Sequence, residues 1–167
     1  MTEWYIADCI DPVEDPDDTP QIHFESEEQL REILNQFRQR RPGLVILKSP
    51  HKEFLKIHIG GPFAGLRWMK EPFSRHYKEA VANPICSPTG VKFTEEGDTN
   101  FLEPEALLPV AQVIEAIIFF YKTQRLPEWI TWMQWNDAAK RMETVPAHSL
   151  PPVTDVVESR QLTPPVA

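Results

Sequence analysis

Histidines, cysteines and one short run of carboxylates are the residues of this chain whose types could do chemistry. The histidines lack the HxxxH and HExxH spacings that bring two imidazoles to one metal ion. Cys9 and Cys86 stand far apart and belong to no CxxC motif, so we expect neither a disulfide framework nor a zinc site. We therefore predict no metal and no cofactor. The histidines are His23, His51, His58, His76 and His148.

Two catalytic arrangements stay open at this level. Cys86 lies in an Ile-Cys-Ser-Pro turn and could act as a nucleophile beside a histidine, although a structural thiol is the simpler interpretation. Glu95, Glu96 and Asp98 could form an acid–base cluster, but Gly97 among them indicates a solvated hairpin loop. Gly60-Gly61 is too short a glycine run to hold a phosphate. We predict that the protein is not an enzyme.

Two helices must position these groups. The first is predicted over Ser26–Arg40, because apolar residues recur from Leu30 at i, i+3, i+4 and i+7. Ser26 and Gln29 have the spacing of a capping box at its start. The second and more apolar helix is predicted over Pro104–Thr123. Shorter helices also fit residues 73–82 and 136–142.

Elsewhere the apolar pattern changes to a period of two, which predicts strands. With these elements we predict an α+β fold, in which an antiparallel sheet of about 5–6 strands packs against two main helices. Residues 1–143 would form one domain that begins with an acidic segment over residues 1–25. Residues 144–167 are rich in proline and would form an extended or disordered tail. The predicted strands are Trp4–Ile10, Leu44–Lys48, Phe54–Ile59, Pro62–Lys70, Val91–Thr94, Thr99–Leu102 and Trp129–Trp135.

The charge of the chain is concentrated at one end. The formal net charge of the 167 residues is −8, yet the first 32 residues hold eleven Asp/Glu and one Arg, a balance of −10. Such acidity disfavours direct contact with nucleic acid or with an anionic membrane, and it suits a basic protein partner. No basic and apolar leader sequence opens the chain, and the thiols fit a reducing compartment, so we expect a cytoplasmic protein.

Several short motifs give the chain a family resemblance. They are GPFAGLRW at residues 61–68, GVKF at 90–93, Gly-Asp-Thr-Asn-Phe at 97–101, and the long helix with the strand after it over Pro109–Trp132. The helix ends in Phe-x-x-Thr-x-x-x-Pro, and a late tryptophan follows. Together these motifs resemble immunity protein family 1 of bacterial polymorphic toxin systems, over residues 42–135. The family favours glycine in the turn after the helix, where this chain has Gln124-Arg125-Leu126.

The resemblance implies a non-enzymatic antidote. Such a protein binds a cognate secreted toxin, in several systems a nucleic-acid deaminase, and occludes the active site of the toxin. The alternative is a non-catalytic adaptor or secretion chaperone for an effector protein. The resemblance implies structural roles for Trp68, Phe120, Pro127 and Trp132. The candidate partner contacts are six acidic residues and one aromatic anchor: Asp15, Asp17, Asp18, Glu95, Glu96, Asp98 and Trp135.

Overall fold

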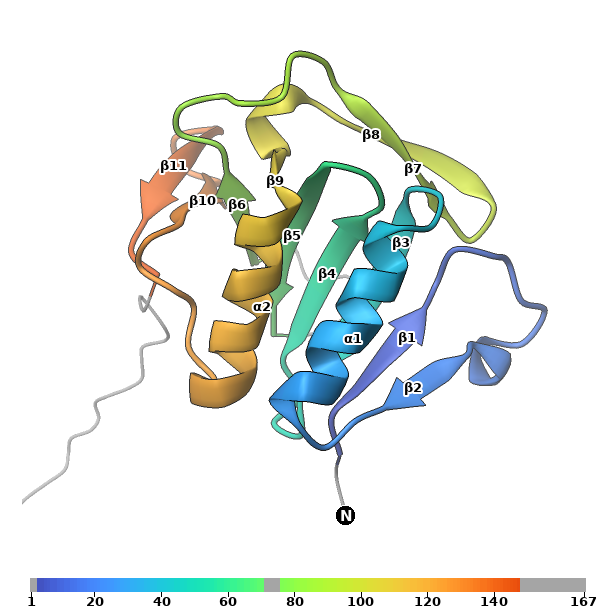
Figure 1. Cartoon of the computed structure of the whole chain (residues 1–167). Helices are drawn as coiled ribbons and strands as arrows, with labels where there is room; N and C mark the ends of the chain where they lie inside the picture. Colours follow the sequence, from blue (N-terminus) through green and yellow to red (C-terminus); the bar gives the residue numbers. More distant parts are fainter. Residues whose placement is uncertain (1–2, 71–75, 148–167) are drawn as a thin grey trace, which may run out of the picture.

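The computed structural model describes residues 3–70 and 76–147, which form two α-helices, two short 3₁₀ turns and eleven strands (Figure 1). The helices are α1 (Glu27–Arg38) and α2 (Val110–Thr123), and the 3₁₀ turns are η1 (Pro16–Asp18) and η2 (Pro104–Ala106). The strands are β1 (Tyr5–Asp8), β2 (Gln21–His23), β3 (Gly43–Lys48), β4 (Phe54–Ile59), β5 (Phe63–Met69), β6 (Tyr77–Val81), β7 (Val91–Glu95), β8 (Asp98–Leu102), β9 (Leu108–Pro109), β10 (Thr131–Asn136) and β11 (Arg141–Val145).

Helix α1 confirms the first predicted helix and its start. The N–H of Gln29 donates to Oγ of Ser26 at 3.2 Å, as in a capping box. The amide oxygen of Gln29 accepts from the N–H of Glu25 at 2.7 Å, one residue earlier than the motif predicts. One N–H group that helix geometry leaves unpaired, that of Gln29, is therefore satisfied by a side chain.

Helix α2 begins at Val110 and not at Pro104 as predicted. Residues 104–106 form η2, and Leu108–Pro109 form the short strand β9, which pairs with Phe63 and Ala64 of β5. Proline disfavours helical geometry in the residue before it, so Leu108 is extended ahead of Pro109. The chain becomes helical only after that proline.

The sheet confirms the α+β class but has eleven strands, not 5–6. Its main order is β11-β10-β6-β5-β4-β3-β1-β2, and neighbours on this path run antiparallel. The hairpin β7–β8 joins β3 through one parallel bridge between Gly43 and Thr94. Within the predicted acidic segment 1–25, β1 and β2 are integral strands of this sheet.

Two predicted short helices are wrong, because sheet pairing decides both segments. Residues 77–81 of the predicted helix 73–82 form β6, which lies between β5 and β10; residues 71–75 lie outside the described part. Of the predicted helix 136–142, residues 137–140 form a turn between β10 and β11, and Trp135 pairs with Met142 across it. Strand β11 continues to Val145, past the predicted boundary at residue 143, and residues 148–167 of the predicted tail lie outside the described part.

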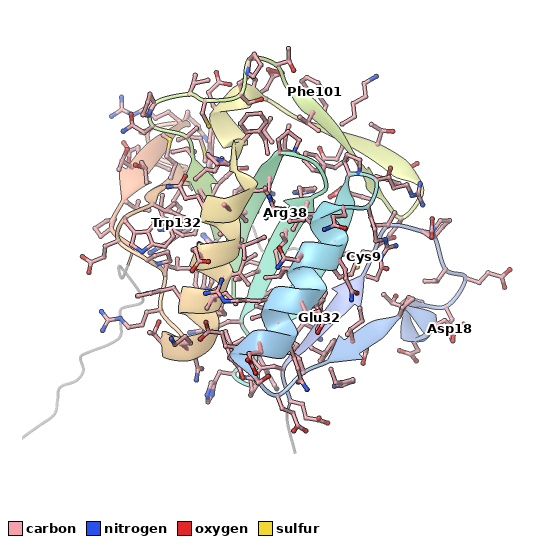
Figure 2. The ribbon with its side chains drawn as sticks, in the orientation of Figure 1. Cys9, Asp18, Glu32, Arg38, Phe101 and Trp132 are labelled. Carbon is pink, nitrogen blue, oxygen red and sulfur yellow. The ribbon has the colours of Figure 1, made fainter. Side chains whose placement is uncertain are left out.

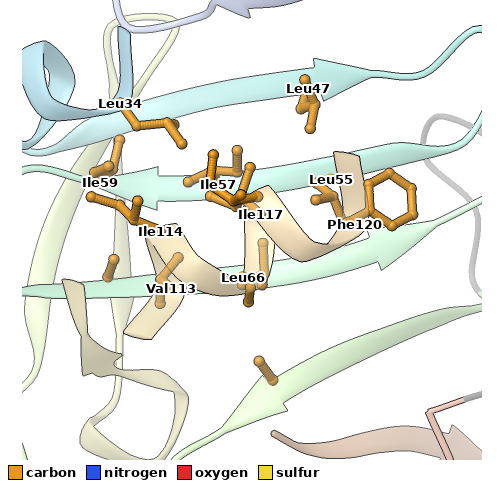
Figure 3. Close-up of a cluster of buried hydrophobic side chains, with 14 of the residues drawn as sticks. Leu34, Leu47, Leu55, Ile57, Ile59, Leu66, Val113, Ile114, Ile117 and Phe120 are labelled. Atoms are coloured by element: carbon orange, nitrogen blue, oxygen red, sulfur yellow. The ribbon is translucent and has the colours of Figure 1, made fainter. Parts of the chain in front are cut away.

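Both α-helices lie on one face of the sheet (Figure 1). Figure 3 shows the core between them and the sheet, where Leu55 and Ile57 of β4 meet Ile117 and Phe120 of α2. Trp68 and Trp132 are also buried on this side. The indole N–H of Trp132 donates to the carbonyl oxygen of Pro127 at 3.0 Å, so two residues of the predicted structural motif are in direct contact. Among the described residues, no helix is long and apolar enough to cross a bilayer.

Candidate functional site

Two acidic loops that are distant in sequence meet at one edge of the sheet. At the tip of the β7–β8 hairpin, the N–H of Glu96 donates to the carbonyl oxygen of Cys9 at 2.7 Å. The N–H of Gly97 donates to the carbonyl oxygen of Ile10 at 3.1 Å. These bonds fix the hairpin tip beside the start of the loop that joins β1 to β2. Figure 1 shows both turns on the same side of the molecule.

Local geometry explains each of the two turns. Glu96 and Gly97 both have positive φ angles, 50° and 87°, which is the backbone of the tight turn that suits a twisted hairpin. In the other loop, the carboxylate of Asp15 accepts from the N–H of Asp17 at 3.0 Å and caps η1. Five of the predicted contact residues are exposed carboxylates on these two turns, and we call them the acidic edge: Asp15, Asp17, Asp18, Glu96 and Asp98.

The acidic edge keeps most of its charge. Arg40 pairs with Asp8 at 3.2 Å, and Arg41 pairs with Asp11, so these two guanidiniums are occupied by acids outside the acidic edge. In the part of the chain that the structure describes, no ion pair reaches a carboxylate of the acidic edge itself. The edge is therefore a site of uncompensated negative charge.

Glu95 has internal partners and does not belong to the acidic edge. Its carboxylate lies 2.8 Å from Nε2 of His58 and 3.4 Å from Nζ of Lys56, both on β4. Asn100 of β8 donates to it at 3.3 Å. The hydrogen bond with His58 is the main reason that the pKa of Glu95 is lowered to about 2. Glu95 thus links the hairpin to the sheet.

Trp135 lies away from the acidic edge. It is on β10, near the other end of the strand order, and its side chain is 43% exposed. Its indole N–H donates to Asp137 at 2.9 Å. The structure therefore separates the predicted aromatic anchor from the predicted acids. Figure 2 shows Asp18 on its protruding loop, far from the exposed Phe101 at the top of the molecule.

A cavity of about 420 Å³ opens on the sheet face that lies opposite the α-helices. Met133 and Met142 form part of its wall, and Phe101 of β8 is 49% exposed beside it. Glu103 and Glu105 border it from the chain around η2. Sequence reasoning missed this group. Alternation along β10 places Met133 and Trp135 on one face, but β6 and β11, which complete the wall, were not predicted.

The two thiols have structural partners. Cys9 is buried, and this desolvation raises its pKa to about 11, so it is a thiol and not a thiolate at neutral pH. Sγ of Cys86 lies 3.6 Å from the carbonyl oxygen of Leu107. Within residues 3–70 and 76–147, no three His, Cys, Asp or Glu side chains are grouped as metal ligands.

Comparisons with known proteins add no relative to this picture: no family model matches the chain, and no curated protein matches it. The resemblance to immunity protein family 1 stays a prediction from the short motifs.

Proposed function

We propose that this protein is a non-catalytic antidote, which acts in the cytoplasm by binding a cognate bacterial toxin that targets nucleic acid, such as a deaminase. The observation that carries the proposal is the acidic edge. Backbone hydrogen bonds join the hairpin tip, which carries Glu96 and Asp98, to residues 9 and 10 at the start of the loop that carries the other three carboxylates. The family resemblance supplies the kind of partner.

The mechanism is electrostatic and steric. A protein that binds nucleic acid carries lysines and arginines where the phosphates lie. The acidic edge offers carboxylates to the same cations, and its uncompensated charge attracts a basic surface before contact. Once the two proteins are in contact, the folded domain covers the nucleic-acid site of the toxin. The protein needs no catalytic group for this action.

The test is neutralisation of the toxin domain encoded by the neighbouring gene. The purified chain should form a stable one-to-one complex with that domain and abolish its activity on nucleic acid. Complex formation and inhibition should both weaken in a variant that combines Asp17→Asn, Asp18→Asn, Glu96→Gln and Asp98→Asn. Glu28→Gln with Glu32→Gln, on exposed positions of α1, should retain both effects; it is matched in charge to Asp17→Asn with Asp18→Asn alone.

Two outcomes would count against the proposal. Full toxin activity in the presence of excess wild-type chain would contradict the antidote function. Complex formation without inhibition would favour the alternative, an adaptor or secretion chaperone that binds the effector outside its active site.

A further inference from the structure

We propose that the cavity opposite the α-helices is a socket for one arginine side chain of the partner protein. It is formed by β8, the chain around η2, and strands β5, β6 and β10, with β11 at its border. That the occupant belongs to a protein rests on the binding function proposed above. It concerns a different surface from the acidic edge, so the two can be tested separately.

The walls of the socket fit an aliphatic stem. Met142 pairs with Trp135 in the β10–β11 ladder, so the two side chains share a face of the sheet. Met133 is two residues before Trp135 on β10 and therefore lies on that face too. Val81 of β6 adds a branched apolar wall. Thioether side chains adapt to irregular apolar groups. The three methylenes of an arginine can therefore pack here while its charged end reaches the rim.

The rim of the socket fits a guanidinium. Three carboxylates and one guanidinium line the cavity, a formal balance of −2. The guanidinium of Arg67 lies 3.1 Å from Glu79 and 4.0 Å from the ring centre of Tyr77, so these two groups are occupied. Glu103 and Glu105 are exposed and form no ion pair with any described residue. Two free carboxylates beside one exposed ring match the planar, bidentate chemistry of arginine.

The exposed Phe101 completes the match. Phe101 lines the cavity and is 49% exposed, so part of its ring is accessible to an incoming side chain. Guanidiniums stack on aromatic faces and pair with carboxylates at the same time. The neighbouring Arg67 makes both contacts within this protein, since its guanidinium stacks on Tyr77 and pairs with Glu79. The socket would repeat it for an incoming side chain.

The socket can be tested with the full chain and a short peptide, Ac-Gly-Gly-Arg-Gly-Gly-NH₂. Methyl NMR of methionine-labelled protein reports on the wall directly, with Met133→Leu and Met142→Leu as assignment variants. The arginine peptide should shift the methyl signals of Met133 and Met142 in a saturable way. The signal of Met69, which does not line the cavity, should not move. Glu103→Gln with Glu105→Gln should weaken binding roughly tenfold.

Two controls decide the result. A peptide with citrulline in place of arginine has the same shape without the charge, so equal binding of this peptide would overturn the proposal. Glu28→Gln with Glu32→Gln changes the charge of the chain equally on exposed positions of α1 and should leave the peptide affinity unchanged. The proposal would also be overturned if the methyl signals of Met133 and Met142 did not shift at a saturating concentration of the arginine peptide.

The two proposals fail separately. If wild-type chain neutralises the toxin but binds no arginine peptide, the socket is wrong and the antidote function stands. If the peptide binds as expected but the chain never inhibits the toxin, the antidote function is wrong and the chemistry of the socket stands.

Discussion

Nε2 of His58 lies 2.8 Å from Oε1 of Glu95, and this contact joins the central strand β4 to the β7–β8 hairpin. His58 is buried, and the side chain of Glu95 is largely covered. The hairpin carries Glu96 and Asp98 of the acidic edge at its tip and Phe101 of the proposed socket farther along. One buried hydrogen bond therefore helps to position both candidate surfaces.

We expect Glu95→Gln to lower the free energy of unfolding by about 1–3 kcal/mol, because it removes the negative charge that strengthens the largely covered contacts with His58, Asn100 and Lys56. Glu96→Gln, at the exposed neighbouring position, is the matched control and should change little. Urea denaturation of the two variants at pH 7 measures the difference. Equal stability of both variants would show that the negative charge of Glu95 contributes nothing to the fold.

The same residue predicts an acid dependence of stability. The pKa of Glu95 falls from an ordinary 4.5 to about 2 in the folded state, first because of the hydrogen bond with His58. A lowered carboxyl pKa stabilises the fold above the unfolded value and loses that effect as pH falls through the folded value. The contribution of Glu95 should thus disappear between about pH 4.5 and pH 2. Denaturation across this range should show the wild-type curve falling toward that of Glu95→Gln.

Lys78 predicts a second rise of stability with pH, at alkaline pH. Burial lowers its pKa from 10.5 to about 8, and its ammonium donates to the carbonyl oxygens of Pro146 and Ala147 at 2.9 and 3.1 Å. Between these pH values the unfolded chain holds a proton that the folded chain has released, so stability rises with pH. We expect a rise on the order of 1–2 kcal/mol. Lys78→Met should remove this rise, and Lys92→Met, at an exposed position, should keep it.

The turn after α2 predicts a stabilising substitution. Gln124 caps the helix with φ at 55°, in the left-handed region that favours glycine. Gln124→Gly should raise the free energy of unfolding by about 1 kcal/mol through relief of backbone strain. Arg125→Gly, next to it, should bring no such gain. A destabilised Gln124→Gly variant in thermal or urea unfolding would show that the side chain of Gln124 has another role.

The indole of Trp132 supports the segment after α2. Trp132→Phe keeps most of the ring but leaves the buried carbonyl of Pro127 without its donor, so we expect a loss of about 1–3 kcal/mol. Trp129→Phe is the control, since Trp129 is about half exposed. Guanidinium denaturation compares the two. Similar losses for both would mean that ring size matters and the hydrogen bond does not.

The sequence determined the elements whose signal is local. Helix α1 was predictable from its apolar spacing and from the capping pair Ser26 and Gln29, because both act within a few residues of chain. The β7–β8 hairpin was predictable from Gly97 between two alternating segments. Strands β4 and β5 were predictable from apolar residues that recur every second position, such as Leu55, Ile57 and Ile59, although most residues of both faces are buried.

Only the tertiary structure decided which distant residues meet. Strands β6 and β11 have no clear local pattern, and they exist because β5 and β10 offer them hydrogen-bonding edges. The acidic edge depends on backbone bonds from Glu96 and Gly97 to Cys9 and Ile10, some 87 residues away in sequence. Glu95 was predicted beside Glu96 as a partner contact, but the pleat of β7 turns its side chain toward His58. Such pairings are long-range, and no local propensity encodes them.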